Sequence, residues 1–143
     1  MAPERFPISE LHSLPGLTPK LDGTFGELIN KAAEGSVDVY FAAVPLVLCI
    51  PYDVDYRPDK HPVGRIAIDQ EKKNCHEGNF ANLHVYQRGA WFVVSDDYIP
   101  LFAALEGNPD YLPCFIYGKP DSKFVIDVQG PIAVEDVREM LGR

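Results

Sequence analysis

The stretch "LHVYQRGAWFVVSDDYIPLFAALEGNPDYLPCFIYG", residues 83–118, carries the clearest structural pattern in the chain. Apolar, strand-like runs at 83–87 and 90–94, separated by the turn-forming "QRG", predict a β-hairpin. A helix is expected from about Asp96 to Glu106, after which a glycine favours its end. "YLPCFIYG" then predicts a buried strand. Two strands, a helix and a third strand in close succession predict a domain that mixes α and β structure.

Shorter elements are expected before this segment. "DGTFGELINKAAEG" predicts an amphipathic helix, because a capping-box pattern begins at Thr24 and Gly35 can end the helix. The next stretch is rich in β-branched and aromatic residues and is interrupted by two prolines. Since proline is poorly tolerated inside central strands, we expect two separate strands, around 37–43 and 46–50.

The remaining elements complete one domain. "GRIAID" at 64–69 predicts a short strand, whereas the polar residues 70–82 lack the apolar spacing of a stable helix. "SKFVIDV" at 122–128 predicts another strand, and residues 130–143 predict a terminal helix. The sum is an α+β fold in a single compact domain, residues 1–143, with a small mixed sheet of about six short strands and about three helices.

Composition narrows the class of partner. The chain has 143 residues, a net charge of -8 and a pI near 4.8. This charge has the wrong sign for tracking a phosphate backbone, so nucleic acid is not expected as a partner. The sequence contains neither a membrane-span pattern nor a secretion-signal pattern, so we expect a cytoplasmic protein without membrane contact. Three widely spaced cysteines predict reduced thiols and no disulfide framework.

The step from strand to helix at 95–98 is the principal candidate ligand site. There Ser95, Asp96 and Asp97 precede Tyr98 at the expected start of a helix. One interpretation is structural, because a serine can cap a helix and carboxylates interact favourably with its positive end. The other is that these residues, with Tyr98 and His84, line a pocket for a cation or a hydroxyl-rich group. In that pocket the two carboxylates would repel phosphate.

Other chemical motifs are weak. "NCHEG" places Cys75, His76 and Glu77 side by side, whereas metal ligands usually come from spaced positions. The chain has no G-x-S-x-G elbow, no catalytic-type cysteine motif and no glycine-rich phosphate loop. We therefore expect no metal site, no cofactor and no assigned catalytic residue.

In its order of elements, the segment 83–118 resembles the central unit of the ParB and sulfiredoxin-like superfamily. "LHVYQ", "WFVVSDD", "IPLFAALEGN" and "YLPCFIYG" follow that family's sequence of strand, strand with ligand turn, helix and strand. The resemblance implies a ParB/sulfiredoxin-like core with its ligand turn at 95–98. Nucleotide-binding members carry a glycine with arginine or histidine at this turn, and sulfiredoxins add a reactive cysteine. None of these residues is present here, which puts nucleotide hydrolysis and sulfinic-acid reduction in doubt.

Two functions follow as expectations. The first is a small, acidic, non-catalytic binding or accessory protein that recognises a protein or a small non-phosphate ligand, with exposed strand edges that allow a homo-oligomer. The alternative is a metal-dependent enzyme acting on nucleotide or nucleic acid. In that enzyme Asp96 and Asp97 would hold the metal, and Arg65 or Arg88 would contact phosphate.

Overall fold

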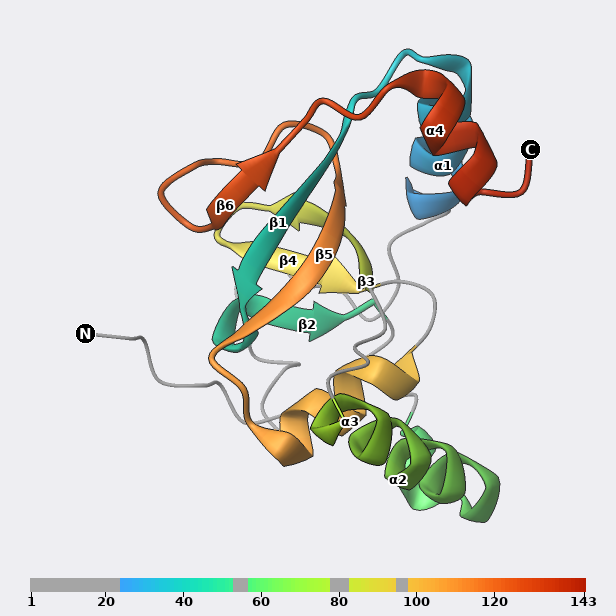
Figure 1. Ribbon diagram of the computed structural model, residues 1–143, viewed down its shortest axis with the longest axis vertical. Coiled ribbons are helices and arrows are strands. Elements are labelled where there is room, and N and C mark those ends of the chain that lie inside the picture. The colour runs from blue at the N-terminus through green and yellow to red at the C-terminus, as the bar shows by residue number, and fades with distance from the viewer. Residues whose placement is uncertain (1–23, 53–56, 78–82, 95–97) are drawn as a thin grey trace.

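A computed structural model describes residues 24–52, 57–77, 83–94 and 98–143 (Figure 1). Within these ranges the chain forms one mixed sheet of six strands in the order β2-β4-β3-β5-β1-β6. The strands are β1 (Val39–Pro45), β2 (Cys49–Pro51), β3 (Leu83–Arg88), β4 (Trp91–Val94), β5 (Tyr111–Tyr117) and β6 (Ile126–Gln129). The α-helices are α1 (Thr24–Glu34), α2 (Pro62–His76), α3 (Tyr98–Gly107) and α4 (Val134–Met140), and the short 3-10 helices are η2 (Leu46–Leu48) and η3 (Pro58–Lys60). The expected small α+β domain is confirmed.

The segment 83–118 forms the middle of the sheet. β3 and β4 are an antiparallel hairpin in which Arg88 pairs with Trp91 across the turn. α3 then carries the chain to β5, which pairs parallel to β3, with Leu83 opposite Cys114. β1 pairs antiparallel to β5 over its whole length. The expected hairpin, helix and buried strand of this segment are therefore confirmed.

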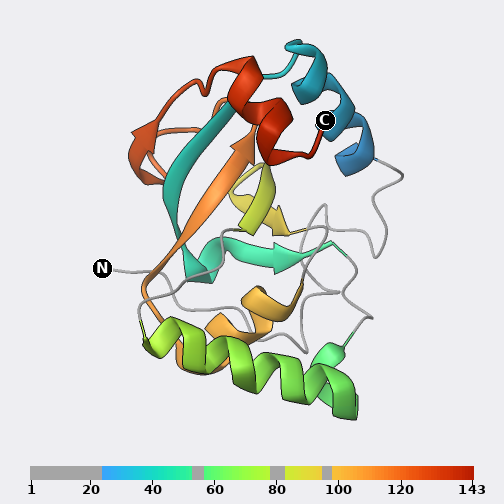
Figure 2. The same ribbon diagram turned by 45° about the vertical axis from the view of Figure 1, so that its right-hand side comes forward.

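Each face of the sheet has its own hydrophobic cluster. On β5, alternate residues Leu112, Cys114 and Ile116 join the cluster that α3 and the buried Ile68 of α2 cover. Tyr117 joins the second cluster, which α1 and α4 cover. Figures 1 and 2 show the two helix pairs at opposite ends of the molecule. The alternation of side chains along the strands thus directs the two helix pairs to different parts of the sheet.

Helix α2 corrects the sequence prediction. Residues 64–69 were expected to form a strand and 70–82 to lack helix, but residues 62–76 form a continuous helix that begins at Pro62. Its apolar residues do not all lie on one face, because Val63 and Ile66 are 80% and 71% exposed while Ile68 is fully buried. The apolar residues of this segment therefore do not show the spacing of an amphipathic helix, and the short run "IAI" has the composition of a strand.

The proline positions give a second difference. Pro45 and Pro51 were expected to lie between strands, whereas each is the last residue of a strand, β1 and β2 respectively. A strand end tolerates proline because the ladder does not continue beyond it. The terminal helix is also shorter than expected, since α4 begins at Val134 and residues 130–133 belong to no helix or strand.

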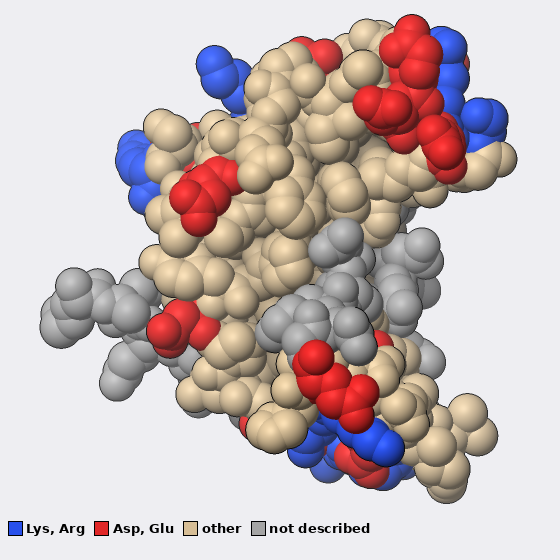
Figure 3. All heavy atoms as spheres, viewed as in Figure 1, with Lys and Arg blue, Asp and Glu red and all other residues tan. Residues whose placement is uncertain are grey.

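Charge and thiols are distributed unevenly. Asp and Glu side chains, with Lys and Arg beside them, gather over the end of the molecule formed by α1 and α4, where Glu135 and Asp136 lie in the first turn of α4 (Figure 3). Cys49 and Cys114 are buried free thiols, and Cys75 is a half-buried one. No helix in the described ranges is long and apolar enough to cross a bilayer.

Candidate functional site

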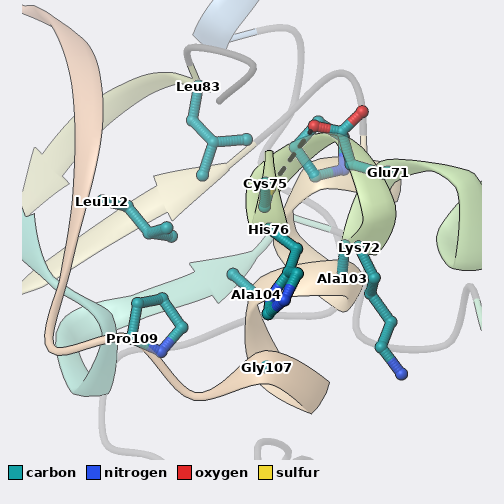
Figure 4. Close-up of a pocket in the computed structure, with 11 residues that line it drawn as sticks. Glu71, Lys72, Cys75, His76, Leu83, Ala103, Ala104, Gly107, Pro109 and Leu112 are labelled. Atoms are coloured by element: carbon teal, nitrogen blue, oxygen red, sulfur yellow. Dashed lines mark hydrogen bonds between the residues drawn. The ribbon is translucent and has the colours of Figure 1, made fainter. Parts of the chain in front are cut away.

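A pocket of about 280 Å³ lies where the last turns of α2 and α3 meet the sheet (Figure 4). Its volume is close to the lower end of the range for small-molecule sites in proteins. Strands β3 and β5 form one side and the two helices form the other. The described residues that line it are Glu71, Lys72, Cys75, His76, Leu83, Pro100, Ala103, Ala104, Gly107, Pro109 and Leu112.

The spacing of the helical residues explains why they share one pocket. On α2, the lining residues that follow Glu71 lie one, four and five positions after it: Lys72, Cys75 and His76. This spacing places all four on one face of the helix over successive turns. α3 contributes residues 100, 103, 104 and 107, whose offsets of three, four and seven positions also place them on one face of their helix. These α3 residues are proline, alanine, alanine and glycine. Because their side chains are short, the helix approaches the sheet without filling the space.

The sheet side of the pocket is apolar. Figure 4 shows Leu83 and Leu112 pointing from their strands toward the helices. Leu83 is 3% exposed and Leu112 is 6% exposed, so both belong to the core and form a fixed wall. The charged and polar lining residues all come from α2. The pocket therefore has an apolar body and one polar side, which is the usual composition of a small-molecule site.

The thiol of Cys75 is the most nucleophilic type of group in the lining. Its Sγ donates a long hydrogen bond of 3.8 Å to Oε1 of Glu71. Burial is the main cause that raises the pKa of Cys75, and the negative charge of Glu71 raises it further. A thiol with a raised pKa stays protonated at neutral pH and is a poor nucleophile. The geometry therefore favours a hydrogen-bonding role for Cys75 over covalent catalysis.

Ion pairs join the two helices beside the pocket. Glu106 of α3 accepts two hydrogen bonds of 2.7 Å from Arg65 and one of 3.1 Å from Nζ of Lys72. Arg65 also donates to Asp69 at 2.7 Å. The hydrogen bond from Arg65 is the largest cause that lowers the pKa of Glu106. The predicted phosphate contact at Arg65 thus belongs to a guanidinium that two carboxylates already bind.

The two predicted site residues that the structure describes, Tyr98 and His84, are not among the described residues that line this pocket. Ser95, Asp96 and Asp97 lie outside the described residues. Tyr98 begins α3 and is only 6% exposed, within the core cluster on the α2–α3 side. His84 lies on β3 between residues that face this cluster, so its ring is on the opposite face of the sheet. Its Nδ1 is 2.8 Å from Oη of Tyr117, and its ring stacks on Phe115.

The structure identifies lining residues that the sequence pattern did not assign to a site. Cys75 and His76 were considered only as neighbours in "NCHEG", where an extended chain would direct their side chains apart. On a helix, both line the pocket together with Glu71 and Lys72. Recognising this would have required predicting α2 first. Over the described ranges, no group of three or more His, Cys, Asp or Glu residues could hold a metal ion.

No protein-family model, curated protein or solved structure matches the chain. The resemblance of residues 83–118 to the ParB and sulfiredoxin-like superfamily therefore stays a prediction.

Proposed function

We propose that this protein is a non-catalytic binding protein that holds a small, mainly apolar molecule in the pocket between α2, α3 and the sheet. The observation that carries this proposal is the lining of the pocket, in which apolar and small residues from β3, β5 and α3 face a polar side supplied by α2 alone. Such a site fixes the orientation of a ligand by its polar end and obtains affinity from burial of its apolar body.

The chemistry of the polar side supports binding over catalysis. The thiol of Cys75 has a raised pKa, so it lacks the thiolate that a nucleophilic mechanism needs. Lys72 is hydrogen-bonded to Glu106 at 3.1 Å, and Figure 4 shows its side chain extending away from Leu83 and Leu112. The polar side of the pocket therefore offers a ligand hydrogen-bonding groups on helical turns.

A glycine on the pocket wall allows a direct test. Gly107 lines the pocket, and a Cβ atom there would meet nothing within 4 Å, so Gly107→Leu adds a side chain on the pocket wall with no clash at its Cβ. Gly26 of α1 is a matched control, because its Cβ would also meet nothing within 4 Å and it lies in the other helix pair. The two variants carry the same substitution in open space.

The experiment is a fragment screen by two-dimensional ¹H–¹⁵N NMR on wild type, Gly107→Leu and Gly26→Leu. We expect apolar fragments with one polar end to shift amide signals of residues 71–76 and 103–107 in wild type and in Gly26→Leu. In Gly107→Leu the same fragments should bind at least tenfold more weakly. Failure of every fragment to bind, or equal binding to both variants, would refute the proposed site.

A further inference from the structure

We infer that the pocket selects a small organic cation, namely a primary ammonium group carried on a compact aliphatic body. This inference depends on the proposed function, because it names the ligand class of the same pocket. It follows from three features of the lining. The C-terminal ends of two helices converge on the pocket, the carboxylate of Glu71 has only a weak hydrogen-bond partner among the described residues, and the nearby Lys and Arg side chains are paired with other carboxylates.

The C-terminal ends of two helices meet at the pocket. Cys75 and His76 are the last two residues of α2, and Ala104 and Gly107 lie in the last turn of α3. Figures 1 and 2 both show the two helices running in the same general direction, so their C-terminal ends lie on the same side. Each helix C-terminus carries roughly half a negative charge from unpaired carbonyl groups. Both helices thus contribute a negative potential at this wall.

Glu71 adds a full negative charge to the same wall. Within the described chain, the thiol of Cys75 is its hydrogen-bond partner, at 3.8 Å, and no ion pair of Glu71 is present. A sulfur donor at this distance is a weak partner for a carboxylate. An ammonium group in the pocket would donate strong, charge-assisted hydrogen bonds to Glu71, in the negative potential of the two helix ends.

The positive groups beside the pocket are largely neutralised by other residues. Lys72 and Arg65 both bind Glu106, and Arg65 also binds Asp69. His76 is the other basic residue of the lining. The described lining contains no phenylalanine, tyrosine or tryptophan, so the cage that favours quaternary ammonium groups is not formed by these residues. A primary ammonium, which donates three hydrogen bonds, fits the acceptors better.

A matched series of ligands tests the inference. Hexylamine, hexanol and hexanoate share one aliphatic body and differ only in the polar end. Their dissociation constants would be measured by NMR titration of the wild-type protein at neutral pH. We expect hexylamine to bind about tenfold more tightly than hexanol, which corresponds to about 1.4 kcal/mol, and hexanoate to bind most weakly.

Two charge-removing variants assign the effect to a residue. Glu71→Gln removes the carboxylate in the pocket, whereas Glu77→Gln removes the same charge at the exposed end of α2, where residue 77 is not among the described lining residues. Hexylamine should lose about tenfold in affinity for Glu71→Gln and keep its affinity for Glu77→Gln. Hexanol should bind all three proteins alike.

The outcomes separate this inference from the proposed function. Equal binding of amine and alcohol, stronger binding of hexanoate, or equal losses in the two variants would overturn the choice of a cation while the pocket keeps its binding role. Binding of none of the three compounds would refute the proposed function and the inference with it.

Discussion

Replacing Gly64 with alanine tests the packing that places α2 beside the pocket. Gly64 is the third residue of α2, and it lies against the 3-10 helix η3. A Cβ atom there would overlap the carbonyl oxygen of Pro58 and lie 2.8 Å from its carbonyl carbon. Since ordinary contacts of a Cβ begin at 3.4 Å, the start of α2 must move by more than half an ångström. Pro58 is fully buried, so the movement disturbs the core.

Two opposing effects determine how the free energy of unfolding changes in Gly64→Ala. Overpacking of this kind costs about 1–3 kcal/mol, while alanine gains up to about 1 kcal/mol over glycine inside a helix. The free energy of unfolding of Gly64→Ala should therefore fall by about 1–2 kcal/mol. The matched control is Gly26→Ala, because Gly26 is also the third residue of its helix and a Cβ there meets nothing within 4 Å. That variant should gain about 0.5–1 kcal/mol.

The assay is urea unfolding followed by far-ultraviolet circular dichroism, with equal slopes required of the three proteins. The two variants should differ by about 2 kcal/mol, or by about 8 °C in Tm for a domain of this size. A Gly64→Ala protein at least as stable as wild type, with unchanged helix content, would show that α2 does not pack on η3 as described.

Three further predictions concern α2 and its contacts. Ile68→Ala should cost about 2–5 kcal/mol in urea unfolding because Ile68 is fully buried, whereas Ile66→Ala should change stability by less than about 0.5 kcal/mol because Ile66 is 71% exposed. Glu106→Gln should lower stability by about 1 kcal/mol at pH 7, since it removes hydrogen bonds from two cations. Because the pKa of Glu106 is lowered in the folded protein, its contribution to stability is fully present above its ordinary value of 4.5 and is lost as the pH falls through the folded-state pKa. The difference in stability between wild type and Glu106→Gln should therefore shrink as the pH falls below 4.5. Cys75 should react with iodoacetamide more slowly than glutathione at pH 8, and Glu71→Gln should speed the reaction by removing a cause of its raised pKa.

A specific outcome would contradict each of these three predictions. Equal losses at Ile66 and Ile68 would indicate a strand, in which both side chains point to the same face. A difference between wild type and Glu106→Gln that persists at low pH would show that the charge of Glu106 is not its cause. Alkylation of Cys75 at the rate of glutathione or faster would show an activated thiol and would favour a covalent role.

The strands and helices of the segment 83–118 could be predicted from local pattern because each is buried in a regular way. β5 alternates between two covered faces, and α3 buries most of its residues from 98 to 104, so local composition and burial agree. The hairpin of β3 and β4 needs only a short turn between two apolar runs. Elements of this kind can be predicted from their own residues, without knowledge of their tertiary contacts.

α2 and the pocket could not be predicted in this way. Only Ile68 of α2 is fully buried, and the helix is held by ion pairs to Glu106 and by the close approach of Gly64 to Pro58. Each contact joins a residue of α2 to a residue of another helix, α3 or η3, so the local sequence of α2 does not reveal it. The ligand site was expected at 95–98, of which only Tyr98 is described, whereas the pocket is formed from Pro100 onward on α3 with Glu71 and Cys75 opposite.

The sequence by itself determined the α+β class, the central hairpin and the helix that follows it, because apolar alternation and turn residues act over short distances. Only the tertiary structure decided that residues 62–76 are helical and that their last turns meet α3 over a pocket. The physical reason is that these residues are ordered by contacts between α2, η3 and α3, which have no counterpart in the local pattern of the chain.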